Sequence, residues 1–209
     1  MSKPHDIDLL LVRSGPTAWD RDERLCGSTD LPLCGEAPSS VEIETDDPEH
    51  AEAIGLVCSG PEESCRQTAT VLSASRGGRI RVIEDLGGVD LGLWEGSLRA
   101  ELNEKFPRAF KQWCQDPTAV SVPEGEPLDA ARDRIVSALS RVLERHKASE
   151  GPVAVVVRPM AFGLIRATLE ERPLDELWSL VEDAGSVWVR VGSTALRKRG
   201  RRAMLPRAS

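Results

Sequence analysis

The stretch Leu9–Thr17, LLLVRSGPT, constrains the fold of this chain more than any other feature. Four apolar residues run directly into the turn RSGPT, which is typical of a buried strand that ends in a turn at its carboxyl end. Open α/β sheets bind their ligands at that end of the strands. An arginine donates two parallel hydrogen bonds to phosphate oxygens, and a glycine lets the backbone approach closely, so Arg13 and Gly15 favour an anion site.

The rest of the chain alternates between strand and helix patterns. Further strands are predicted at Ile54–Cys58, Arg79–Ile83, Val153–Val157 and Ser186–Val191. Helices are predicted at about Pro61–Ala74, Ser97–Cys114 with a break at Pro107, Leu128–Lys147, and Ala161–Glu170. This order predicts an α/β fold, a three-layer sandwich in which a mixed, mostly parallel sheet carries helices on both faces.

Length and charge indicate one domain with a basic end. The 209 residues suffice for one sizeable domain, which we place at residues 1–195, and a tail at 196–209 is expected to be disordered. The net charge is −7, and the last thirteen residues hold six basic groups and no acid, so the body before them carries −13. Nucleic acid is therefore not an expected partner of the body.

Composition argues against membrane, metal and disulfide chemistry. The longest apolar runs are too short to span a bilayer, and MSKPHDID carries no signal-peptide core, so a cytoplasmic location without membrane association is expected. Five cysteines without a CxxC pair and three isolated histidines predict free thiols and no metal site, and no cofactor motif such as a P-loop is present. Cys58 lacks the arginine spacing of a cysteine phosphatase.

The first block, LVRSGPTAWDRDERLCGSTDLPLCGE, resembles the signature LVRHGxTxWNxxxRxxGxxDxPLxxxG of the histidine phosphatase superfamily, the phosphoglycerate-mutase-like proteins. The positions in register are Arg13, Gly15, Thr17, Trp19, Arg24, Gly27, Asp30, Pro32, Leu33 and Gly35. Residues 60–69, GPEESCRQTA, are similar to the family block SPLxRAxQTA, and Leu86–Gly96 is similar to LxEidfGxwEG. PEGEP at 123–127 resembles the PGGES element, and the likeness extends over about residues 6–191.

The resemblance implies a phosphoryl-transfer site in which four groups are replaced. The family's nucleophilic histidine falls on Ser14, its second arginine on Ser64, its acid on Gly88 and its second histidine on Arg158. A serine hydroxyl needs an adjacent base, and no histidine stands at a matched position. Loss of the acid typically costs about 10²–10⁴-fold in rate. The expected function is therefore a degenerate, catalytically silent member of the family.

Two interpretations of the remaining pocket stay open. Arg13, Arg158 and Arg66 converge, with Ser14, Gly15 and Thr17, to bind a phosphate-bearing small molecule, or Arg158 pairs with an acid such as Asp90 or Glu95 and the pocket is filled.

A phosphatase or phosphomutase with a rearranged site is the alternative function, and a scaffold for a protein partner is another outcome of lost catalysis. The acidic, proline-broken segment 36–50 departs from the helix expected there, and a second subunit covering that face, as in a homodimer, is one hypothesis.

Overall fold

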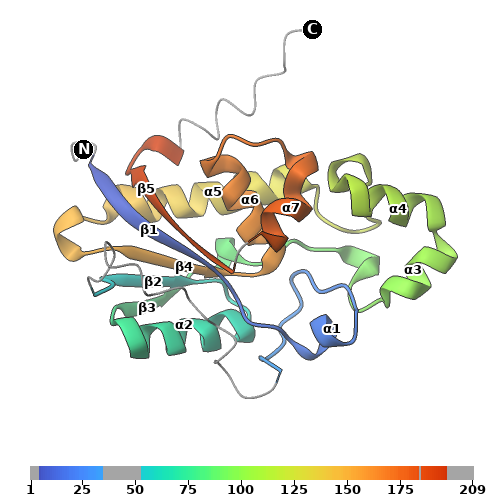
Figure 1. The fold of residues 1–209 in the computed structure, drawn as a ribbon, viewed down its shortest axis with the longest axis horizontal. Coiled ribbons are helices and arrows are strands. Elements are labelled where there is room, and N and C mark those ends of the chain that lie inside the picture. The colour runs from blue at the N-terminus through green and yellow to red at the C-terminus, as the bar shows by residue number, and fades with distance from the viewer. Residues whose placement is uncertain (1–4, 35–52, 184, 197–209) are drawn as a thin grey trace, which may run out of the picture.

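The computed structural model describes residues 5–34, 53–183 and 185–196. Its centre is a five-stranded sheet with the strand order β3-β2-β4-β1-β5 (Figure 1). The strands are β1 (Asp6–Arg13), β2 (Leu56–Ser59), β3 (Arg79–Val82), β4 (Val153–Val157) and β5 (Ser186–Gly192). β1, β2, β3 and β4 run parallel, and β5 pairs antiparallel with β1. The predicted mixed, mostly parallel sheet is thereby confirmed.

Helices cover both faces of this sheet. α2 (Glu63–Arg76) lies on one face, and α5 (Leu128–Arg145), α6 (Pro159–Leu169) and α7 (Leu177–Glu182) lie on the other (Figure 1). The short α1 (Ala18–Arg21) follows β1. α3 (Arg99–Lys105) and α4 (Pro107–Gln115) extend beyond the carboxyl end of the sheet, and Pro107 stands at the first turn of α4, where its missing N–H costs nothing.

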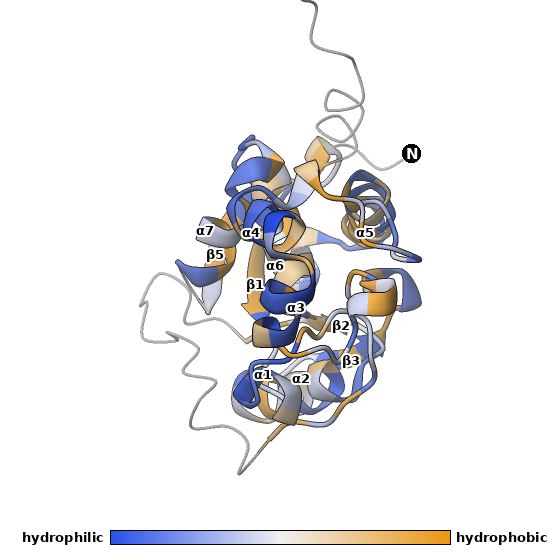
Figure 2. Cartoon of the chain, turned by 90° about the vertical axis from the view of Figure 1, so that its right-hand side faces the viewer, coloured by the Kyte–Doolittle hydropathy of each residue, from blue (hydrophilic) through white to orange (hydrophobic). Residues whose placement is uncertain are grey.

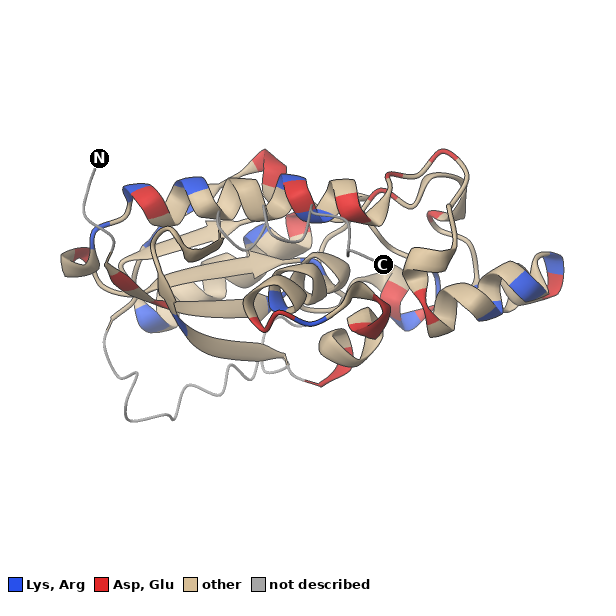
Figure 3. Cartoon of the chain, turned by 90° about the horizontal axis from the view of Figure 1, so that it is seen from above, with Lys and Arg blue, Asp and Glu red and all other residues tan. Residues whose placement is uncertain are grey.

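The core follows the alternation of the strands. In β1, Leu9 and Leu11 pack with the side of α5 and α6, whereas Leu10 and Val12 pack with the side of α2. All five residues of β4 are fully buried, which explains its uninterrupted valine-rich sequence. Figure 2 shows hydrophobic strands inside helices that carry both hydrophilic and hydrophobic residues, and the Lys, Arg, Asp and Glu residues in Figure 3 lie mainly on helices and loops.

Strand register positions the candidate site. Arg13 pairs with Val157 across β1 and β4, so the two central parallel strands end at the same level. The turn that begins with Ser14 and the residue after β4, Arg158, consequently lie next to each other. This is the ligand-binding edge that parallel sheets provide.

Several details differ from the prediction. α2 begins at Glu63 and ends at Arg76, two residues later at each end than the predicted Pro61–Ala74. Of the two single 3₁₀ turns in this region, Glu84–Leu86 ends where the glycine-rich stretch Leu86–Gly96 begins, and Gly92–Trp94 lies within it. Leu196, placed at the start of the tail, is 1% exposed and belongs to the core. The rest of the tail and the acidic segment 36–50 lie outside the described residues.

Of the helices in the described part of the chain, none is long and apolar enough to cross a membrane.

Candidate functional site

The site is built around the guanidinium of Arg158. This side chain is 1% exposed and stands at the cap position that precedes α6. Its Nη1 donates to the hydroxyls of Ser14 and Ser64, each at 3.4 Å. Its Nη2 donates to both carboxylate oxygens of Asp20, at 3.3 and 3.2 Å. Three of the four replaced family positions therefore meet around one buried cation.

Local structure holds the Asp20 carboxylate in place. Thr17 and Asp20 form a capping box at the start of α1, in which the backbone N–H and the hydroxyl of Thr17 both donate to Asp20 Oδ2 at 2.7 Å. In the ion pair between Arg158 and Asp20, only the Arg158 side chain is fully buried, because the Asp20 side chain is 30% exposed. Burial is the largest single effect on the pKa of Arg158 and lowers it, but the Asp20 carboxylate together with Cys26 and Cys65 raises the pKa above its ordinary value.

Backbone hydrogen bonds fix the turn after β1. The N–H of Ser14 donates to the carbonyl of Val157 at 2.8 Å, and the N–H of Gly15 donates to the Thr68 hydroxyl at 3.1 Å. That hydroxyl in turn donates to the carbonyl of Ser64 at 2.8 Å. The turn is thereby tied to β4 and α2, and Ser14 is held with its hydroxyl facing Arg158.

The position of the missing acid is occupied by another carboxylate. Glu62 is 2% exposed, and its Oε1 accepts a hydrogen bond from the N–H of Gly88 at 2.5 Å. Glu62 Oε2 and Arg158 Nε are buried without a hydrogen-bond partner among the described residues. A Cβ atom on Gly88 would stand 2.2 Å from the carbonyl oxygen of Gly27. The backbone at position 88 thus leaves no space for the side chain that the family pattern places there.

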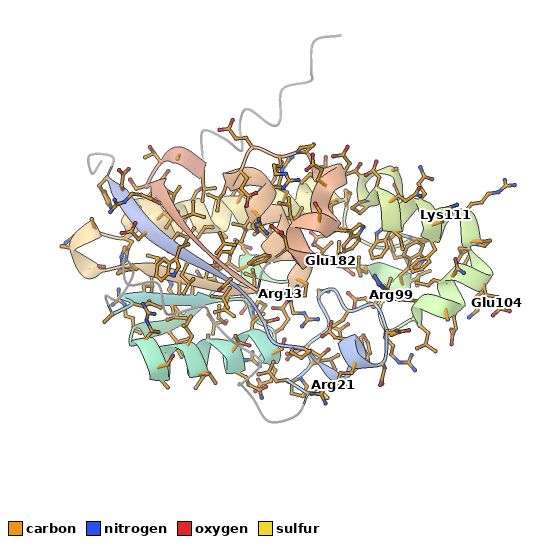
Figure 4. All side chains as sticks on the ribbon, in the orientation of Figure 1. Arg13, Arg21, Arg99, Glu104, Lys111 and Glu182 are labelled. Carbon is orange, nitrogen blue, oxygen red and sulfur yellow. The ribbon has the colours of Figure 1, made fainter. Side chains whose placement is uncertain are left out.

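Of the two interpretations left open, the structure does not show the convergence of three arginines. Arg13 Nη1 donates to the carbonyl of Val181 at 2.6 Å, beside α7 (Figure 4). Arg66 binds the Glu63 carboxylate and the Pro61 carbonyl, and its side chain is 41% exposed. Of the three, Arg158 alone lies among the serines of the site.

The expected acid partner of Arg158 is also corrected. Arg158 pairs with Asp20 and not with Asp90 or Glu95, because the capping box already places a carboxylate beside it. Glu95 instead accepts hydrogen bonds from the N–H groups of Gly27 and Leu91 and so fastens one loop to another.

No activated nucleophile is present around Arg158 in the described residues. The His5 ring is hydrogen-bonded to the carbonyl of His146, and the His146 ring is hydrogen-bonded to the carbonyl of Gly151. Both histidines therefore lie at the amino end of β1, at the opposite end of the strand from Ser14. Burial raises the pKa of the Cys26 and Cys65 thiols, so both stay protonated and weakly nucleophilic at neutral pH. Among the described residues, no group of histidine, cysteine and carboxylate side chains is arranged to hold a metal ion.

Asp20 and Glu62 are the two site residues that the sequence analysis missed. Asp20 stands where the family pattern has asparagine, and Glu62 stands where it has leucine. Relative to the family pattern, the chain has an additional carboxylate at Asp20 and an additional arginine at position 158. These two substitutions together could have predicted an ion pair. Glu62 offered a weaker signal, since a charged residue at a helix start is usually solvated.

The mostly parallel sheet, with the Arg13–Thr17 turn at the carboxyl end of β1, defines an α/β protein with a phosphatase-like fold. Comparisons with known proteins agree with this class. The profile of the histidine phosphatase superfamily (branch 1) matches residues 9–197. The chain is 24% identical to phosphoserine phosphatase 1 of Hydrogenobacter thermophilus over 180 residues, 86% of this chain and 84% of that protein. It is 28% identical to phosphoglycerate mutase-like protein 4 of Arabidopsis thaliana over 171 residues, 79% and 72% of the two chains.

Solved structures show the same architecture. YhfR of Bacillus stearothermophilus superimposes with a TM-score of 0.69 at 25% identity and covers 82% of this chain and 84% of its own. The mycobacterial glucosyl-3-phosphoglycerate phosphatase Rv2419c in complex with VO3 superimposes with a TM-score of 0.72 at 19% identity, over 88% and 92%. The chain belongs to the histidine phosphatase superfamily.

Proposed function

We propose that this chain is a catalytically silent member of the histidine phosphatase superfamily that acts by binding and not by turnover. The observation that carries the proposal is the Arg158 guanidinium, which is buried between Ser14 and Ser64 and paired with Asp20. A phosphoryl group entering this pocket meets a cation whose counter-ion is already supplied by the chain. No described base stands ready to activate the Ser14 hydroxyl.

The same arrangement supports the interpretation in which an acid of the chain fills the pocket. An external anion competes for Arg158 with Asp20, which the capping box holds with two hydrogen bonds from Thr17. We therefore propose that phosphate-bearing small molecules are not the ligands of the wild-type pocket. Binding partners, including a second subunit, then contact other surfaces of the domain.

One observation favours the alternative of a rearranged phosphomonoesterase. The Glu62 carboxyl group is buried against the backbone of Gly88, so a carboxyl group remains near the place of the family's acid. An acid alone does not suffice, because the phosphoryl group still needs a nucleophile that the described site does not offer.

Hydrolysis of p-nitrophenyl phosphate and phosphoserine tests the proposal. The wild-type protein is expected to release phosphate no faster than the buffer does without protein. The comparison is a variant with Ser14→His, Asp20→Asn, Ser64→Arg and Arg158→His, which restores the family's residues at these four positions and keeps Glu62. Turnover by the wild type that Ser14→Ala abolishes would show a rearranged enzyme and refute the silent assignment.

A further inference from the structure

The molecule contains a cavity near the Arg158 site, lined in part by Met160 and Val89, which follow Arg158 and Gly88 in the chain. The cavity has a volume of about 420 Å³ and lies between residues 117–127, the first turn of α5, and side chains from α4 and α6. Its apolar wall is formed by Val89, Leu91, Trp113, Val120, Met160 and Leu174. Ser14, Ser64 and Arg158 do not line it. The volume lies within the range of about 300–1,000 Å³ that is typical of small-molecule sites.

The aromatic part of the wall is fixed before any ligand enters. Trp113 is 3% exposed, its ring lies 4.5 Å from that of Trp178, and it stacks on Phe110 at 6.0 Å. The indole N–H of Trp178 also donates to the Trp113 carbonyl at 2.8 Å. Such a wall loses little entropy on binding, which favours an apolar ligand body.

The charges that line the cavity have one sign. Its ionisable residues are Glu126 and Asp129, and none of its lining residues is a lysine, arginine or histidine. Arg134 neutralises Glu126 through a contact of 2.6 Å between Nη2 and Oε1. Asp129 is exposed at the cavity rim, where its Oδ1 accepts a hydrogen bond from the N–H of its neighbour Ala130 at 3.0 Å. An anionic ligand is disfavoured here, in contrast to the substrates of a phosphatase.

We propose that this cavity binds a small apolar amine, with the apolar body against Trp113 and the ammonium group beside Asp129. The Thr118 and Ser121 hydroxyls, which also line the cavity, supply further acceptors for the ammonium protons. This inference goes beyond the catalytic silence of the Arg158 site and holds whether or not that site turns over phosphate.

A pair of ligands with one ring and opposite charges tests the proposal. The full chain labelled with 5-fluorotryptophan gives ¹⁹F signals for its five tryptophans. The signal that is absent from the Trp113→Phe variant is that of Trp113, in the cavity wall. Titration with 2-phenylethylamine is expected to move the Trp113 signal to saturation, whereas 3-phenylpropionate binds on the order of tenfold more weakly, because its charge faces Asp129.

Two variants and one control locate the effect. Asp129→Asn is expected to bring the affinities of the two ligands together, and Glu104→Gln, at the far end of α3 (Figure 4), is expected to leave their ratio unchanged. Val120→Phe fills the cavity and is expected to abolish the shift, while unchanged signals of the other tryptophans report an intact fold. No saturable shift with the amine, equal binding of both ligands, or full binding by Val120→Phe would each overturn the proposal.

Discussion

At the scale of single residues, the site is explained by substitutions that compensate one another. An arginine in place of the family's second histidine adds a permanent positive charge, and Asp20 in place of an asparagine adds a negative one. The small side chains of Ser14 and Ser64 provide the volume that the guanidinium fills, and both hydroxyls accept from it. A buried guanidinium is tolerated only with such a counter-ion and such acceptors.

Asp20→Asn tests this charge pair. The amide keeps the shape and the capping acceptor but removes the counter-ion of Arg158, and the free energy of unfolding is expected to fall by about 1–3 kcal/mol, below the value for a fully buried pair because Asp20 is partly exposed. Urea denaturation measures the change. Asp22→Asn, an exposed aspartate of the same segment, is the matched control, and equal losses in both variants would contradict a role for the pair.

A buried thiol predicts the alkaline behaviour of the protein. Burial raises the pKa of Cys58 from an ordinary value of 9.0 to about 12, so the folded state binds this proton more tightly than the unfolded state. The resulting stabilisation is complete below pH 9 and is lost as the pH rises from 9 toward 12.

Thermal unfolding between pH 8 and pH 11 measures this loss. Cys58→Ala is expected to unfold at a lower temperature at pH 8, because a cavity replaces the sulfur, and to lose stability less steeply above pH 9. Buried Cys65 keeps part of the slope in both proteins, since burial raises its pKa as well. Identical slopes for the two proteins would show that Cys58 does not contribute.

At the scale of elements, local sequence patterns predicted the helices and strands closely. They did not predict which contacts the side chains at the ends of these elements make. The predicted break at Pro107 is confirmed, and α5 and β4 begin at the expected residues, because strong periodicity and proline stereochemistry act locally. The direction of Arg13 toward the carbonyl of Val181 was not predictable, since residues far apart in the chain decide it. The close approach of the Gly27 and Gly88 backbones was hidden for the same reason.

Gly88→Ala tests that close approach of two loops. The added methyl group would meet the Gly27 carbonyl oxygen at 2.2 Å, so a loop must move, and the free energy of unfolding is expected to fall by about 1–3 kcal/mol. Gly185→Ala is the matched control, because a Cβ atom there meets nothing within 4 Å. Chemical denaturation of the two variants gives the comparison, and a Gly88→Ala protein as stable as its control would show that the acid position has room.

At the scale of the whole molecule, fold and chemistry separate. The sheet, its helical layers and membership of the histidine phosphatase superfamily followed from motifs spread over the chain, because those motifs are the turns that the fold requires. The state of the pocket did not follow, since the sequence left open whether Arg158 faces a ligand or an internal acid. The structure pairs Arg158 with Asp20, so in this phosphatase-like fold the residues at the family's catalytic positions hold an internal ion pair.

Thermal unfolding with inorganic phosphate or with chloride at equal ionic strength tests this central claim most directly. The wild type is expected to show the same Tm in both salts, because Asp20 already satisfies Arg158. Asp20→Ala is expected to have a lower Tm that phosphate raises by several degrees, and the double variant with Arg158→Met is expected to lose that rescue. A wild-type Tm that rises with phosphate as much as that of Asp20→Ala would contradict the account, since the pocket would then be open to external anions.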